Sequence, residues 1–327
     1  MTTLTPPSKP RTTKEYLGLV LRGFAMGSAD VVPGVSGGTM ALILGIYEEL
    51  INSIRAVDFT FARLVISLRL REALEKLPWK FLASVATGIG LAIFSLARFL
   101  SWMLENHPVL IWSFFFGLVL ASVITVSRQV KTWHPATIVG AILASIGSYF
   151  LVGSVPVQTP NAPWFLFLSG AIAICAMILP GISGAFILVL LGKYQYVLNA
   201  VNERDIVTLL LVMAGAAIGI VTFAQFLGWL FKRYHDLTIA LLIGLMLGSL
   251  RKLWPWKETL RTLVDRHGDE IPVEQINILP ASWNGEVAFA IALALAGFAA
   301  VLMISRWAVS LSSETVRGKK YGRRGHC

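Results

Sequence analysis

The stretch "ADVVPGVSGGT" (Ala29–Thr39) interrupts a segment that is otherwise apolar enough to lie in a membrane. A helix in lipid must satisfy its backbone N–H and C=O groups internally, because no water is present to bind them. Pro33 removes one donor, and the glycines permit backbone angles that other residues avoid. The stretch therefore predicts a helix break, with a new helix beginning near Gly38. Such a break is tolerated only inside protein or beside a polar cavity.

The same break occurs a second time. "VVPGVSGGTMALILGIYEELIN" (31–52) aligns at a constant offset with "ILPGISGAFILVLLGKYQYVLN" (178–199). The identities include proline, glycine, serine, tyrosine and asparagine. Apolar segments align by chance, but these residue types do not fall into one register by chance. The alignment predicts a duplicated broken helix, with the second new helix beginning near Ala185.

A second pair of segments extends the duplication to the whole chain. "GLVLAS" (117–122) aligns with "GLMLGS" (244–249) at a shorter offset, so the first half has an extra segment at 55–80. We therefore expect two related membrane repeats, at 15–155 and 163–310.

Composition places the protein in a membrane. Hydrophobic residues are 56% of the chain and charged residues only 14%. The uncharged runs 109–127 and 136–156 are each about long enough to cross a hydrocarbon core as helices. The net charge of +10 lies largely in loops and tails, which favours contact with anionic lipids over nucleic acid. These features predict an all-α, multi-pass protein of the cytoplasmic (inner) membrane, and they do not indicate its oligomeric state.

Lysine and arginine positions orient the segments. The tail 1–14 and the segment 55–80 are both basic, so we expect both on the cytoplasmic side, with a re-entrant hairpin between them. The predicted crossings are 81–103, 109–127 and 136–152 in the first half and 206–230, 237–250 and 285–305 in the second. Three crossings is an odd number, so the second half, with its own hairpin at 164–199, is inverted relative to the first. Inverted repeats are the architecture of many secondary transporters.

This topology places the loops 153–163 and 251–284 outside and the basic tail 311–327 in the cytoplasm. The segment 55–80 mixes apolar and basic residues at helical spacing, which predicts an amphipathic segment on the cytoplasmic membrane face. In the alternative topology each broken segment crosses once, and 55–80 lies outside. Whether the hairpin arms span fully stays open.

The two breaks are the candidate substrate site. The first N–H groups of a helix have no intrahelical partner and carry the positive end of the helix dipole, so they can bind an anion. The helix-break residues are Pro33, Gly34, Pro180 and Gly181, and the candidate binding residues beside them are Ser36, Gly37, Gly38, Thr39, Ser183 and Gly184. With inverted symmetry, both helix ends would approach one midplane site. In the alternative interpretation, small residues only let the helices pack closely.

Asp30 is a carboxylate at membrane depth, which is costly and usually functional. It is expected to carry a proton, to pair with Arg22 or Arg98, or to cap the broken backbone. Arg98 is also an anion-binding candidate, although snorkelling to the interface explains it equally well. No spacing of the two cysteines or five histidines indicates a disulfide framework or a metal site. No cofactor is indicated, and coupling to a proton or sodium ion stays open.

"GSADVVPGVSGGTMALILGIYEELI" and "LPGISGAFILVLLGKY" together resemble the signature of the polyprenyl-phosphate transporter family, also described as domain-of-unknown-function family 368. The resemblance covers about 15–310. It implies a bacterial or archaeal multi-pass protein that returns undecaprenyl phosphate, the lipid carrier of cell-wall synthesis, across the cytoplasmic membrane. The motif residues it carries over are Gly27, Asp30, Pro33, Gly34, Ser36, Gly37, Gly38, Thr39, Pro180, Gly181, Ser183 and Gly184. The loop 251–284 and the basic C-terminal tail depart from the pattern.

The expected function is therefore translocation of a polyprenyl phosphate. Its charged head group crosses lipid slowly because the charge must be desolvated, and a protein need only shield that group while the tail stays in the bilayer. One alternative is a transporter of a small anion or other solute. Another is an intramembrane lipid phosphatase, but the histidines lie away from both breaks, where such chemistry would need them. A membrane scaffold gives no reason for two helix breaks.

Overall fold

The computed structural model describes residues 11–30, 36–264 and 270–321. Pro33 and Gly34, two of the predicted helix-break residues, lie outside the described residues. The helices of the first half are α1 (Thr13–Asp30), α2 (Gly37–Ile43), α3 (Tyr47–Arg55), α4 (Phe59–Ile66), α5 (Leu70–Lys76), α6 (Trp79–Asn106), α7 (Pro108–Ser127) and α8 (Pro135–Val152). Those of the second half are α9 (Pro163–Ile178), α10 (Gly184–Leu190), α11 (Tyr194–Asn202), α12 (Ile206–Arg233), α13 (His235–Leu253) and α14 (Gly285–Tyr321).

The multi-pass helical class is confirmed. Within the described residues, α6, α7, α8, α12 and α14 each contain a segment long and apolar enough to cross a membrane. The short helices α10 and α11 together form a sixth candidate, bent by 105°. The remaining predicted crossing, α13, is a helix of 19 residues with Asp236 in its first turn and Arg251 and Lys252 in its last, and it is not among these candidates.

The two halves repeat the same order of elements. Each half begins with a long helix and two short ones, α1 to α3 in the first and α9 to α11 in the second. A helix of 28 residues follows, α6 or α12, and in the first half the extra helices α4 and α5 precede it. α1 packs along α6, and α9 packs along α12. The last two helices of each half pack on the last two of the other half: α7 packs on α14, and α8 packs on α13. We call this arrangement the exchange of the last helices.

Small residues at equivalent positions allow this exchange. Gly117 and Gly244 are counterparts in the aligned segments of α7 and α13. A Cβ atom at Gly117 would clash with the backbone of Ala294 in α14, and one at Gly244 would clash with Ala141 in α8. Close backbone approach through small residues is how helices associate in lipid, where no hydrophobic force drives them together.

The structure adds detail to three regions, and one of them differs from the sequence-based expectation. The segment 55–80 is two short helices, α4 and α5, joined near Leu68, which has a φ of 55°. The loop 251–284, in a chain predicted to be all-α, contains two antiparallel strands, β1 (Lys257–Val264) and β2 (Glu270–Asn277), with Lys257 opposite Asn277. The tail 311–327 continues α14 as far as Tyr321.

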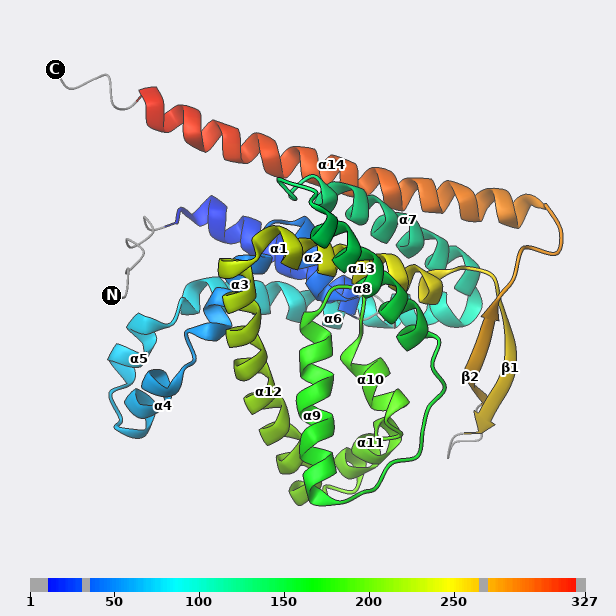
Figure 1. Ribbon diagram of the computed structural model, residues 1–327, viewed down its shortest axis with the longest axis horizontal. Coiled ribbons are helices and arrows are strands. Elements are labelled where there is room, and N and C mark those ends of the chain that lie inside the picture. The colour runs from blue at the N-terminus through cyan, green and yellow to red at the C-terminus, as the bar shows by residue number, and fades with distance from the viewer. Residues whose placement is uncertain (1–10, 31–35, 265–269, 322–327) are drawn as a thin grey trace.

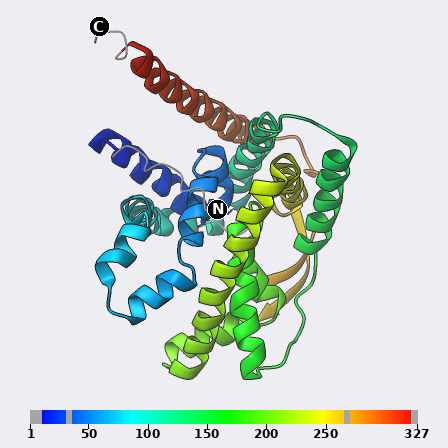
Figure 2. The same cartoon turned by 60° about the vertical axis from the view of Figure 1, so that its left-hand side comes forward.

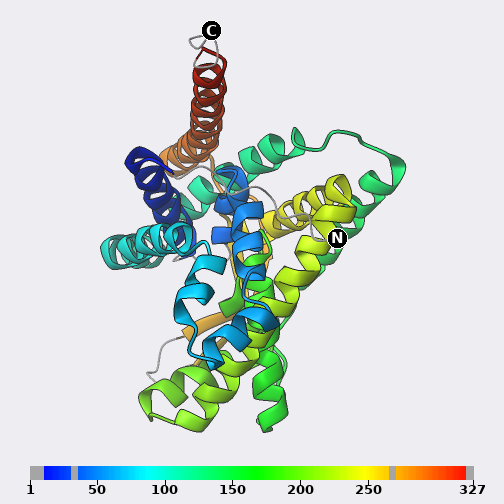
Figure 3. The same ribbon diagram turned by 90° about the vertical axis from the view of Figure 1, so that its left-hand side faces the viewer.

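Two groups of elements lie at opposite ends of the long axis of the molecule. The first turn of α1, the pair α4 and α5, and the C-terminal end of α14 lie at the left of Figure 1, whereas β1 and β2 lie at the right. Figures 2 and 3 show the fold from two other directions, with the C-terminal part of α14 projecting from the other helices. The short helix α2 lies inside the protein, with all seven of its residues buried. The helix that follows the first break is therefore enclosed by protein, as a helix start at membrane depth requires.

Candidate functional site

The first break ends α1 at Asp30 and starts α2 at Gly37, one residue from the predicted start. The Gly37 N–H donates to the Asp30 carboxylate, with N and Oδ1 2.6 Å apart. Ser36 is the N-cap of α2, and its hydroxyl accepts from the Gly38 N–H at 3.1 Å. Thr39 N lies 2.9 Å from the Ser36 carbonyl oxygen. The first N–H groups of α2 are thus satisfied by the protein itself, and Asp30 occupies the place of an anion there.

The second break contains Pro180 and Gly181, two of the predicted helix-break residues. α9 ends at Ile178 and α10 begins at Gly184, with Pro180 and Gly181 between them. Gly181 has a φ of 87°, a left-handed conformation that glycine adopts without a steric penalty. The N-cap of α10, Ser183, makes no side-chain cap within the described structure, and the position equivalent to Asp30 is Met177. The two helix starts are therefore not equivalent.

The two breaks meet through hydrogen bonds between the halves. The Ser36 hydroxyl lies 3.2 Å from the carbonyl oxygens of both Met177 and Leu179. The Tyr47 hydroxyl donates to the carbonyl oxygen of Ile178, also at 3.2 Å. Carbonyls at the C-terminal end of a helix have no intrahelical partner, and leaving them unpaired inside a membrane protein would be costly. Side chains of the first half satisfy them here.

The contact also runs from the second half to the first. The Gly181 N–H donates to the Thr39 hydroxyl oxygen at 3.1 Å. Gly38 permits the close approach, because a Cβ atom there would lie 2.5 Å from the Ile178 carbonyl oxygen. We call this set of contacts, formed by residues 36–39 and Tyr47 with residues 177–181, the break junction. It brings the two predicted loops together, with many of their polar groups already paired to each other.

The remaining predicted site residues are Arg22, Arg98, Ser183 and Gly184, which are not part of this set of contacts. Arg22 is partly buried on α1, eight residues before Asp30 and so about 12 Å along the helix. Arg98 is exposed on α6. Among the described residues, no ion pair joins either arginine to Asp30. Gly184, the first residue of α10, is buried, and Ser183 beside it is partly buried.

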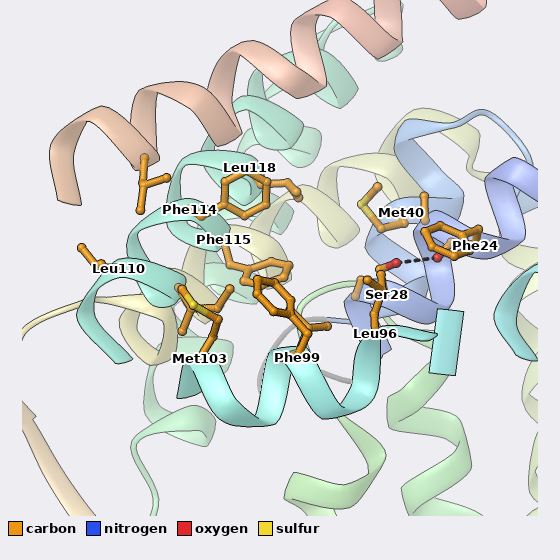
Figure 4. A pocket seen from close by; sticks show the side chains of 15 residues that line it. Phe24, Ser28, Met40, Leu96, Phe99, Met103, Leu110, Phe114, Phe115 and Leu118 are labelled. Carbon is orange, nitrogen blue, oxygen red and sulfur yellow. Dashed lines mark hydrogen bonds between the residues drawn. The ribbon is translucent and has the colours of Figure 1, made fainter. Parts of the chain in front are cut away.

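An apolar cavity of about 470 Å³ lies beside the first break (Figure 4). Its walls come from α1, α2, α6, α7 and α14, and they include Ala29 and Met40, which flank the break. The hydroxyl of Ser28 faces its own helix, where it donates to the Phe24 carbonyl oxygen at 2.8 Å. Sequence reasoning missed this cavity, because its lining is ordinary apolar residues spread over five helices.

Fold and site together define a multi-pass α-helical membrane protein with two broken helices that meet in its interior. A family model described as undecaprenyl phosphate translocase-like matches residues 26–271, a range that includes both breaks. The chain belongs to this family, as the resemblance of its two motifs predicted.

Two curated relatives agree with this assignment. The chain is 42% identical over 302 residues to a polyprenyl-phosphate transporter of Vibrio cholerae serotype O1, covering 90% of this chain and 98% of that protein. It is 30% identical over 254 residues to a polyprenyl-phosphate transporter of Staphylococcus aureus, covering 72% of this chain and 85% of that protein. No solved structure shows a significant match.

Proposed function

We propose that the chain translocates polyprenyl phosphates, with undecaprenyl phosphate as the expected substrate, across the cytoplasmic membrane to recycle the lipid carrier of envelope synthesis. The observation that carries this proposal is the match to the translocase-like family over 26–271, which spans both helix breaks. The names of the two relatives support the same substrate class.

The geometry fits a substrate with a charged head and an apolar tail. The polar break junction and the apolar cavity adjoin, because Ala29 and Met40 line the cavity while Asp30 and Gly37 form the hydrogen bond that opens α2. A prenyl segment in the cavity would hold the phosphate near the junction, with the rest of the tail in the bilayer. An apolar wall of this kind favours a lipid over a small hydrophilic anion.

Asp30 gives this scheme a proton-linked step. A phosphate that reaches the Gly37 N–H would compete with the Asp30 carboxylate, which accepts that hydrogen bond. Protonation of Asp30 would weaken its hold on the N–H and free the position for the substrate. In this proposal Ser36, Gly38 and Thr39 form the first side of the binding site. Ser183 and Gly184, at the uncapped start of α10, form the second side.

The inverted topology belongs to the same proposal. It is supported by the repeated order of helices and by the separation of α4 and α5 from the β-hairpin along the molecule (Figure 1). Both halves would then present one broken helix to the centre from opposite faces, the arrangement of inverted-repeat transporters.

Purified protein in liposomes tests the function directly. A polyprenyl phosphate with a labelled head group is placed in one leaflet, and head-group crossing, release of phosphate and uptake of soluble phosphate are measured together. We expect protein-dependent crossing without phosphate release. Release of phosphate would favour the lipid phosphatase, and uptake of soluble phosphate without lipid crossing would favour the small-anion transporter.

A further inference from the structure

Two lysines lie together where α13 ends and β1 begins, against helices of both halves. The Lys257 ammonium group lies 4.3 Å from the ring centroid of Trp112 in α7, and it donates to the Lys252 carbonyl oxygen at 2.6 Å. The Lys252 ammonium group lies 5.4 Å from the ring centroid of Phe186 in α10. Both cations are therefore held by aromatic rings and backbone, from the first half on one side and the second half on the other.

These cations have no counter-ion in the described part of the chain. No carboxylate there forms an ion pair with Lys252, Lys257 or the adjacent Arg251, whose guanidinium stacks 4.4 Å from the ring centroid of Tyr149. Burial, and then the charge of Lys252, lowers the pKa of Lys257 to about 7. Partly desolvated like charges are costly, and an anion bound between them would relieve that cost.

The lysines also adjoin the proposed substrate path. Ser249, one turn before Lys252 on α13, packs against the second break, where a Cβ atom at Gly181 would lie 2.7 Å from its hydroxyl oxygen. Trp112, under Lys257, follows Ile111, which lines the apolar cavity on α7. The pair thus lies between the second break and the helix that forms one wall of the cavity.

We propose that Lys252 and Lys257 bind the phosphate monoester head group of the prenyl lipid before it enters the break junction. This inference rests on the proposed function and adds a receiving site to it. In the alignment of the two halves, Thr125 is the counterpart of Lys252, so the first half has no cation at this aligned position. The proposed receiving site lies on the face of the β-hairpin, which the predicted topology places outside the cell.

Binding of farnesyl phosphate, a short prenyl phosphate, to the purified protein in detergent tests the site. Farnesol reports binding of the tail alone, and inorganic phosphate reports binding of a soluble anion. We expect Lys252→Met and Lys257→Met each to weaken farnesyl phosphate binding at least about tenfold, the effect of one lost charge-assisted hydrogen bond, with farnesol binding unchanged. Lys232→Met, which removes the same charge from an exposed position at the end of α12, should bind as the parent protein does.

The variants are expected to fold, because a methionine of similar length removes a partly desolvated charge and keeps the packing. Thermal unfolding checks this, and Lys257→Arg, which keeps the charge, should retain more binding than Lys257→Met. Unchanged affinity in the folded methionine variants would overturn the site. Lysine-dependent binding of inorganic phosphate as tight as that of farnesyl phosphate would overturn the lipid assignment.

The test separates this inference from the proposed function. If the parent protein moves lipid across liposomes while the lysine variants bind farnesyl phosphate normally, the receiving site is wrong and the function stands. If the parent protein binds farnesyl phosphate through the lysines but moves no lipid, the site stands and translocation is wrong.

Discussion

Asp30 is the residue in which structure and expected function meet most directly. Its carboxylate accepts a hydrogen bond from the Gly37 N–H and so completes the start of α2. The sequence singles it out because an acid in an apolar stretch is rare and costly. The sequence could not select among its three expected roles, because the partner depends on the path of the loop that follows. Arg22 and Arg98 are suitable by charge, but neither forms an ion pair with Asp30 among the described residues.

Asp30→Asn separates the charge from the cap. The amide oxygen of asparagine can still accept from the Gly37 N–H, so we expect the variant to insert and fold. Transport should fall about tenfold or more, because the variant can no longer change its charge at this position and its hydrogen bond is weaker. Head-group crossing in liposomes and thermal unfolding measure the two effects. Normal transport by a folded Asp30→Asn protein would leave Asp30 with the role of a cap alone.

Lys252 and Lys257 show the opposite case, in which sequence reasoning passed over a candidate. Lysines after a membrane helix are ordinary signals of topology, and acidic residues in the same loop nearly balance their charge. Their closeness to each other and to Trp112 and Phe186 arises only when the end of α13 packs against α10 and β1 begins against α7. No local pattern predicts such a contact.

Among the elements, α2 and the end of α9 determine how the halves are joined. The starts of the helices after the two breaks, α2 and α10, could be predicted to within one residue, because proline and glycine act on the backbone within their own turn. The hydrogen bonds between them could not, since they join residues about 140 positions apart, such as Ser36 and Met177. The β-hairpin was missed because the charged residues along β1 and β2 give the segment the composition of a loop.

Ser36→Ala tests the break junction. The substitution removes the cap of the Gly38 N–H and the donor to the carbonyl oxygens at the end of α9, leaving buried groups unpaired. We expect a loss of about 1–3 kcal/mol in the free energy of unfolding, seen as a lower unfolding temperature in detergent.

Ser154→Ala is the matched control, since Ser154 is exposed after the end of α8 and donates to the Phe150 carbonyl oxygen. It should change the unfolding temperature little. An equal effect of both substitutions would show that the junction adds nothing specific to stability.

At the scale of the whole molecule, the duplication could be predicted from the sequence because Pro, Gly, Ser, Tyr and Asn recur in one register. The packing of α7 on α14 and of α8 on α13 could not be predicted from it. It depends on which helix meets each small residue, and the sequence shows only that Gly117 and Gly244 are small.

Cysteine labelling tests the topology. In a chain with Cys175 and Cys327 replaced by serine, we expect Ser154→Cys to react with an impermeant thiol reagent from outside the cell and Ser67→Cys not to. Both positions are exposed, so access to the reagent decides the outcome. Ser67→Cys should react once the membrane is permeabilised. Labelling at Ser67→Cys in intact cells would exclude the re-entrant hairpin and, with it, the inversion.

The break junction also orders events during synthesis. The first half leaves the ribosome before the second. Until α9 is made, the hydroxyls of Ser36 and Thr39 can bond to neighbouring backbone, as serine and threonine commonly do. The carbonyls of Met177 and Ile178, at the end of α9, have no following turn of helix to bond to. They emerge into a membrane where the hydroxyls of Ser36 and Tyr47 are already present. The half whose polar groups have local partners is therefore translated first, and the half whose carbonyls need partners from the other half is translated second.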